Sequence, residues 1–160
     1  MRNRFGKLIA EAMQADPRIW LLTGDLGFGV LDQARQTCPE RFCNVGAAEQ
    51  LMLGTAVGLA HSGMIPVVYS ITPFVIFRPY EYLRNYLDHE KCPVKLVGAG
   101  RGQDYGHLGF SHWADDANRA LNLFPNIEQF MPDTINQLEE DWEDWLYSDH
   151  PSYLNIRRSV

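Results

Sequence analysis

Four short segments of the sequence combine glycines or aromatic residues with side chains that can do chemistry. They are residues 23–29, 44–50, 70–82 and 100–113. These segments hold carboxylates, arginines, histidines and several glycines. Carboxylates and imidazoles are the usual proton carriers in enzymes, and arginines bind anions. The four segments are therefore the candidates for catalysis or ligand binding.

Glu49 is the residue best placed for proton transfer. Ala47 and Ala48 precede it, and the apolar run Leu51–Ala60 follows almost at once, so we expect a half-buried carboxyl group. A buried carboxylate needs a partner, and none lies nearby in the sequence. A glutamate in a first helical turn is more often a surface residue that complements the helix dipole. Spacing alone leaves both interpretations open.

The remaining segments give weaker signals. The glycines at 24, 27 and 29 follow a short apolar run and could cradle a phosphate, but their spacing matches neither GxGxxG nor GxxxxGK[ST]. Arg78 lies among aromatic residues, where it could pair with Glu81 or Asp88 or bind an anionic substrate. His107 and His112 suit hydrogen bonding to a polar substrate, and neutral surface histidines are the alternative.

Metal binding is not favoured. Cys38, Cys43 and Cys92 form no CxxC pair, and no histidine pair lies at ligand spacing near them. We read them as reduced thiols of a cytoplasmic protein.

Alternating strands and helices position these segments. The expected strands are residues 19–22, 42–45, 66–70, 94–97, 127–130 and 152–156. The expected helices are residues 5–13, 30–38, 47–62, 74–89, 114–123 and 134–147. This order predicts an α/β fold, a three-layer sandwich around a mostly parallel sheet of about six strands. Ligands bind beyond the carboxyl ends of such strands, where the loops that start at Gly24, Val45, Ser70 and Gly98 should meet.

Composition narrows the classes of protein further. The chain has 160 residues, 46% hydrophobic residues and a formal net charge of -6, without a basic stripe. We therefore expect one domain over residues 1–160 and no nucleic-acid partner. The apolar runs stop well short of the ~18 residues that span a membrane. The first residues lack the apolar core of a signal peptide. A cytoplasmic protein without a membrane partner is the expectation.

In this order the segments resemble the pyrimidine-binding domain of transketolase and of 1-deoxyxylulose-5-phosphate synthase. The resemblance covers almost the whole chain. It rests on Pro39-Glu40-Arg41-Phe42, Asn44-x-Gly46-x-Ala48-Glu49-Gln50, Gly54, Gly58-Leu59-Ala60, Gly63, Pro66, Tyr69-Ser70, Phe74, Arg78, Tyr105-Gly106-x-x-Gly109-x-Ser111-His112 and Pro125-Asn126. A single Gly-Ala-Glu match would mean little, but this ordered set is specific.

The resemblance implies a role for particular residues around thiamine diphosphate. The glutamate at the Glu49 position hydrogen-bonds a ring nitrogen of the cofactor's aminopyrimidine, which favours loss of the proton from C2 of the thiazolium. Phe74 matches the aromatic residue that stacks on the pyrimidine. The implied catalytic residues are Glu49 and His112. The implied cofactor contacts are Asp25, Leu26, Glu49, Ile71, Phe74 and Phe77. The implied substrate contacts are Arg78, Arg101, His107 and His112.

Three departures from the family pattern shape the expected function. Leu108 and Trp113 replace the usual Asp and Gln, which puts the usual sugar-phosphate specificity in question. The sequence has no Asn-Asn motif, which in this family helps to hold the diphosphate through Mg²⁺. We therefore expect a second subunit to supply the diphosphate-binding domain and Mg²⁺, and this chain to be silent without it. A homodimer of this chain within a heterotetramer is the expected assembly.

The resemblance predicts a thiamine diphosphate-dependent transferase of carbohydrate metabolism. It would move a ketol or acyl fragment between sugar-like substrates. One alternative is the beta-type subunit of a 2-oxo acid dehydrogenase or decarboxylase, with a keto acid as the substrate. The other alternative is a non-catalytic regulatory relative, against which Glu49 and Phe74 argue.

Overall fold

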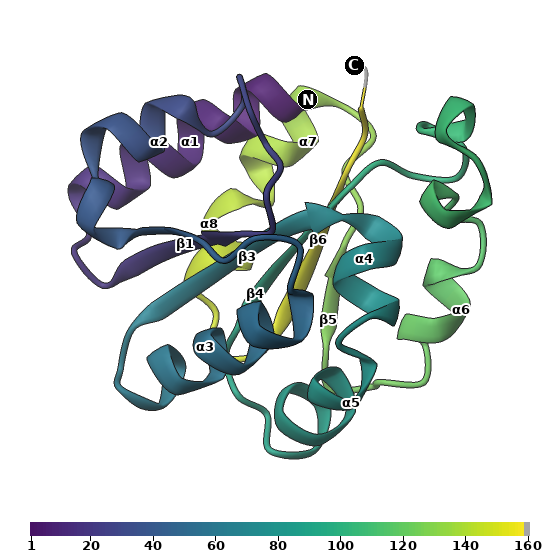
Figure 1. Ribbon diagram of the computed structural model, residues 1–160. Coiled ribbons are helices and arrows are strands. Elements are labelled where there is room, and N and C mark those ends of the chain that lie inside the picture. Colours follow the sequence, from purple (N-terminus) through teal and green to yellow (C-terminus); the bar gives the residue numbers. More distant parts are fainter. Residues whose placement is uncertain (159–160) are drawn as a thin grey trace.

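A six-stranded parallel sheet forms the centre of the molecule, as the computed structural model shows for residues 1–158 (Figure 1). The strand order is β2-β1-β3-β4-β6-β5, and every neighbouring pair is parallel. The strands are β1 Ile19–Thr23, β2 Phe42–Asn44, β3 Ile65–Ile71, β4 Lys95–Ala99, β5 Glu128–Phe130 and β6 Ser152–Ile156. The predicted α/β fold and its six strands are confirmed.

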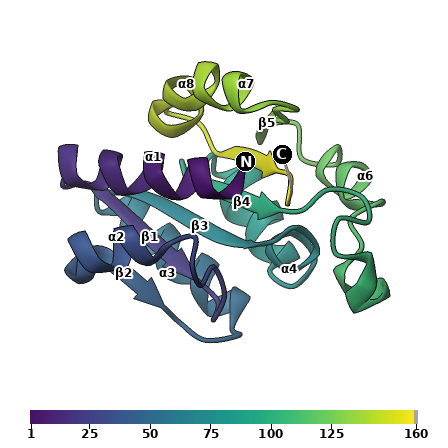
Figure 2. The ribbon, with the colours of Figure 1, turned by 90° about the horizontal axis from the view of Figure 1, so that it is seen from above.

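Helices cover both faces of this sheet, which explains the continuous apolar runs of its central strands (Figure 2). All residues of β4 and β6 are buried. One apolar cluster packs α1 (Arg2–Ala15), α2 (Asp32–Thr37), α7 (Ile135–Glu140) and α8 (Trp142–Tyr147) on one face. The second cluster packs α3 (Glu49–His61), α4 (Thr72–Phe77), a π-helical segment (Leu83–His89) and α6 (Ala117–Leu121) on the other.

The predicted long helix 74–89 is broken near its middle. It consists of α4, the short α5 (Tyr80–Tyr82) and the π-helical segment Leu83–His89. The helix breaks at Pro79 because proline has no N–H to donate and its ring clashes with the preceding turn. As a result α4 becomes a short, separate helix at the carboxyl edge of the sheet.

The predicted helix 134–147 is also divided. Its two parts, α7 and α8, are separated by Asp141. Thr134 caps α7 in a capping box with Gln137. The break falls at an aspartate, a poor helix former, with further acidic residues on both sides. Within residues 1–158, no helix is long and apolar enough to cross a membrane.

Candidate functional site

Glu49 and Arg78 form an ion pair at the carboxyl edge of the sheet. The distance between Arg78 Nη1 and Glu49 Oε1 is 2.7 Å. The Glu49 side chain is 3% exposed, whereas the Arg78 side chain is 44% exposed. Glu49 is the first residue of α3, and Arg78 directly follows α4. Burial of Glu49 is thus confirmed, and its partner is a residue 29 positions away.

The ring of Phe74 completes this arrangement. The Cζ atom of Arg78 lies 3.6 Å from the centroid of the Phe74 ring, so the guanidinium rests on the ring. The His112 imidazole packs against the same ring, with 4.9 Å between centroids and an angle of 66° between the ring planes. His112 comes from a 3₁₀ turn, Phe110–His112, in the loop after β4. The fold therefore brings together four predicted site residues from three segments.

The loop after β1 lies against Glu49. Asn44 joins this loop to the one after β2, because its Oδ1 accepts hydrogen bonds from the backbone N–H of Asp25 at 2.8 Å and of Gly46 at 3.1 Å. A Cβ atom on Gly24 would lie 3.2 Å from the Gly46 carbonyl oxygen and 3.5 Å from Glu49 Oε1. Glycine at 24 thus lets the first loop approach the carboxylate closely.

A hollow of about 530 Å³ opens beside the ion pair. It is lined by Ala47, Ala48, Glu49, Gln50, Leu51 and Arg78. Leu51 is 59% exposed, an unusual degree for a leucine in an apolar helix. The Glu49 carboxylate therefore lies at the wall of a recess that has both polar and apolar sides.

The other predicted cofactor contacts differ in exposure and in the side of the sheet on which they lie. Asp25 is exposed and has a positive φ of 58°, a conformation that aspartate tolerates better than most residues. Ile71 precedes α4 and is half-buried, and Phe77 is 39% exposed. Leu26, by contrast, packs against the apolar cluster under α1 and α2. Its side chain therefore lies on the other side of the sheet from α3.

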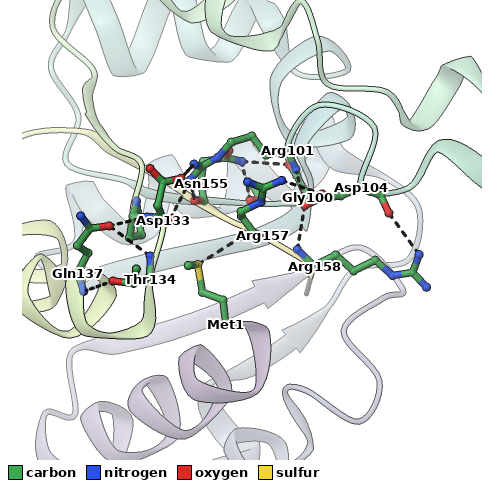
Figure 3. A network of polar contacts seen from close by, with 12 residues as sticks. Met1, Gly100, Arg101, Asp104, Asp133, Thr134, Gln137, Asn155, Arg157 and Arg158 are labelled. Carbon is green, nitrogen blue, oxygen red and sulfur yellow. Dashed lines mark hydrogen bonds and ion pairs between the residues drawn. The ribbon is translucent and has the colours of Figure 1, made fainter. Parts of the chain in front are cut away.

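Arg101 belongs to a polar network with Asn155, Asp133 and Asp104 (Figure 3). Its guanidinium donates to Asn155 Oδ1 at 2.8 Å, Asp133 Oδ1 at 2.7 Å, the Pro132 carbonyl at 3.0 Å and the Asn155 carbonyl at 2.8 Å. These four bonds favour a structural role for Arg101 over the predicted substrate contact.

Asp104 ties the loop after β4 to the segment after β6. Its carboxylate accepts hydrogen bonds from the backbone N–H of Arg101 at 3.1 Å and of Arg158 at 3.0 Å, and it pairs with Arg157 at 3.5 Å (Figure 3). Burial acts to raise the Asp104 pKa, but these backbone hydrogen bonds and the Arg157 charge outweigh it. They hold the pKa below its ordinary value.

His107 lies at the exposed side of this loop. Its Nδ1 is 3.3 Å from Arg158 Nη1. The predicted substrate contacts thus fall into two groups, with Arg78 and His112 beside Phe74, and Arg101 and His107 in the network around Asp104.

Sequence reasoning missed the positioning role of Asn44 and Asn155. Asn44 belongs to the motif before Glu49, yet nothing in its spacing shows that it holds two loops together. Asn155 is 1% exposed, and its amide nitrogen contacts Thr72, Tyr153 and the carbonyls of Gly98 and Gly100. The available signal was the polar asparagine in a strand that the sequence predicts to be buried.

Among the described residues, no three His, Cys, Asp or Glu side chains gather as a metal site would require.

The family model for "Transketolase, pyrimidine binding domain" matches residues 1–160. The chain belongs to this family. Glu49, Phe74 and Arg78 therefore lie within a transketolase pyrimidine-binding domain. The predicted resemblance is confirmed over the full length of the sequence.

Curated relatives of this domain come from several bacteria. An uncharacterized 33.6 kDa protein in the fasciation locus of Rhodococcoides fascians is 30% identical over 160 residues, which cover 100% of this chain and 51% of that protein. One of the subunits of apulose-4-phosphate transketolase from Actinobacillus succinogenes is 35% identical over 102 residues, 64% of this chain and 33% of that relative. The chain spans about half the length of the curated relatives that it matches from end to end.

Solved structures of transketolases share the fold. A structure described as a split gene transketolase, inactive beta4 tetramer, is 31% identical and superposes with a TM-score of 0.85 over 99% of this chain and 51% of that chain. Transketolase from Leishmania mexicana superposes equally well, with a TM-score of 0.85, at 19% identity over 98% of this chain and 25% of its own. The α/β architecture is therefore that of transketolase pyrimidine-binding domains.

Proposed function

We propose that this chain supplies the pyrimidine side of a thiamine diphosphate site in a transketolase-type enzyme built from two kinds of subunit. The observation that carries the proposal is the buried Glu49 carboxylate beside the Phe74 ring, in a chain of this family. Relatives named as transketolase subunits support it. Among them are one subunit of apulose-4-phosphate transketolase and one of 6-deoxy-6-sulfo-D-fructose transketolase, the latter from a Clostridium species.

The residues present fit an aminopyrimidine ring. The Arg78 guanidinium, which is flat and carries N–H donors, already lies against Phe74 and bonds Glu49. An aminopyrimidine is likewise flat and presents nitrogen atoms at its edge. Phe74 would orient the plane of the ring, and Glu49 would hold a proton at a ring nitrogen. When bound, the cofactor supplies a carbon nucleophile that carries the ketol fragment.

The diphosphate and Mg²⁺ would be held by a second subunit. We propose that the cofactor binds where the two subunits meet, and relatives named as transketolase subunits support this arrangement. A dimer of this chain within a heterotetramer follows from the two-fold pairing of such domains. The tetramer of a related split gene transketolase supports an oligomer of this kind.

The substrates would be sugar-like ketoses and aldoses with an anionic end. Related subunits are named for a phosphorylated sugar and a sulfonated sugar. Arg78 and His112 lie beside Phe74 and are the nearest predicted contacts for such a substrate. Leu108 is 49% exposed in the same loop as His112, so it would present an apolar surface to the substrate.

Exchange of Glu49 for glutamine tests this function. Glu49→Gln keeps the size of the side chain and a hydrogen bond, but its amide cannot carry a proton. In the complex isolated through this chain, hydrogen–deuterium exchange at C2 of thiamine diphosphate should slow by ~10²–10⁴-fold. The control is Glu81→Gln, the same exchange at an exposed carboxylate of α5. An unchanged exchange rate in a well-folded Glu49→Gln complex would contradict the proposed role.

A further inference from the structure

Arg78 makes both of the contacts that the proposed site offers to a flat ligand. Its Nη1 lies 2.7 Å from Glu49 Oε1, and its Cζ lies 3.6 Å from the centroid of the Phe74 ring. Because the Glu49 carboxylate and the Phe74 ring contact the same guanidinium, they form one binding site for a planar group. A second planar group cannot lie on the same ring face and bond the same oxygen, so Arg78 and such a ligand exclude each other.

We infer that Arg78 is an internal ligand that fills the pyrimidine site of the chain before the cofactor binds. The inference rests on the proposed function and adds a step to it. The guanidinium must leave Phe74 and Glu49 when an aminopyrimidine arrives. The site is then closed by its own arginine in the chain without cofactor and opened when a planar pyrimidine ring takes the place of the guanidinium.

The surroundings show which part of the site moves. Glu49 is 3% exposed in the first turn of α3, and Phe74 lies in α4, whose neighbours Pro73 and Val75 are buried. These two side chains are held by the packing of their helices. The Arg78 side chain is 44% exposed and lines the hollow of about 530 Å³. It can turn away without disturbing the core.

The ion pair also explains how the chain keeps Glu49 buried. A carboxylate taken out of water is strongly destabilising unless a charged or hydrogen-bonding partner compensates it. Arg78 supplies that partner while no ligand is bound. The same contact lowers the apparent affinity for a ligand, because only the fraction of molecules with Arg78 turned away can bind it.

Binding of the pyrimidine half of the cofactor to this chain tests the inference. The probe is 4-amino-5-hydroxymethyl-2-methylpyrimidine, titrated into the wild type, Arg78→Ala and Arg84→Ala and followed by NMR. Arg84 is the matched control, since it is also an exposed arginine but bonds Asn85 instead of Glu49. Arg78→Ala should bind the probe about tenfold more tightly than the wild type. Arg84→Ala should bind it with wild-type affinity.

A second measurement needs no variant. The protons of Arg78 lie over the Phe74 ring, and the ring current should shift their resonances in the ligand-free wild type. Addition of the pyrimidine probe should return these resonances to ordinary values. Equal affinity in the wild type and Arg78→Ala, or Arg78 resonances that do not change while the probe binds, would overturn the inference and leave the proposed function intact. Failure of the wild type and Arg78→Ala alike to bind the probe would also overturn the inference, whereas the proposed function is decided separately by Glu49→Gln in the complex.

Discussion

Two arginines at the carboxyl edge of the sheet show how differently one residue type can be used. Arg78 pairs with one buried carboxylate and rests on an aromatic ring, with its side chain 44% exposed. Arg101 donates four hydrogen bonds to fixed partners, and its side chain is 21% exposed. The first arginine can exchange its partner for a ligand. The second is part of the framework that holds the loop after β4.

The comparison teaches that the number of bonds and the exposure of a side chain separate binding groups from structural ones. Arg101 lies in the loop after β4, and Arg78 follows the short helix α4 that comes directly after β3, so both lie beyond the carboxyl ends of strands, where parallel sheets bind ligands. Position in the fold therefore does not distinguish them. Arg101 is fixed because its planar donors match several acceptors at once, whereas Arg78 faces a recess.

The largest effect on stability is expected at Asn155. Asn155→Ala removes the acceptor of Arg101 Nε and leaves the buried groups of Gly98, Gly100 and Thr72 with fewer donors. Unsatisfied buried polar groups of this kind should lower the free energy of unfolding by roughly 3 kcal/mol. Urea denaturation of the chain measures this. A loss below about 1 kcal/mol would show that the network is less important than its geometry indicates.

Substitution of each arginine by methionine sharpens the comparison directly. Arg101→Met removes four hydrogen bonds and should cost roughly 2 kcal/mol of unfolding free energy. Arg78→Met should cost only about 1 kcal/mol, because the amino end of α3 and water from the adjoining hollow take over from the guanidinium as partners of Glu49. The same urea experiment checks both variants. A greater loss for Arg78→Met would reverse the assignment of framework and binding roles.

The smallest effect is a dependence on pH at Asp104. The pKa of this carboxyl is lowered in the folded chain, so the unfolded chain takes up the proton first as the pH falls. The stabilisation is therefore complete at neutral pH and is lost progressively below about pH 4.5. The difference in unfolding free energy between the wild type and Asp104→Asn should shrink over that range. A difference that stays constant between neutral and acid pH would contradict this linkage.

The sequence predicted the strands and the burial of Glu49 because both depend on local pattern. Continuous apolar runs are typical of parallel strands covered on both faces. Small and apolar neighbours predicted a half-buried carboxyl at 49, and the structure buries it more deeply, at 3% exposure. The cofactor and substrate roles of the site residues remain predictions.

The partner of Arg78 was beyond the reach of sequence pattern. The sequence offered Glu81 or Asp88 as partners, or an anionic substrate, but the helix breaks at Pro79 and the arginine pairs with Glu49. That contact joins two helices on the same face of the sheet, so it depends on tertiary packing. The networks of Asn44 and Asn155 depend on packing in the same way, since each joins segments that are not adjacent in the chain.

The two edges of the sheet influence how copies of this chain can associate. β2 and β5 are the edge strands, and each has three residues, whereas β3 in the interior has seven. Unpaired N–H and C=O groups on a long edge invite another strand, and a short edge offers few of them. Extension of the sheet from one copy into the next is therefore disfavoured. Association through helical faces leaves the hydrogen bonding of the sheet undisturbed and guards against fibrous aggregation.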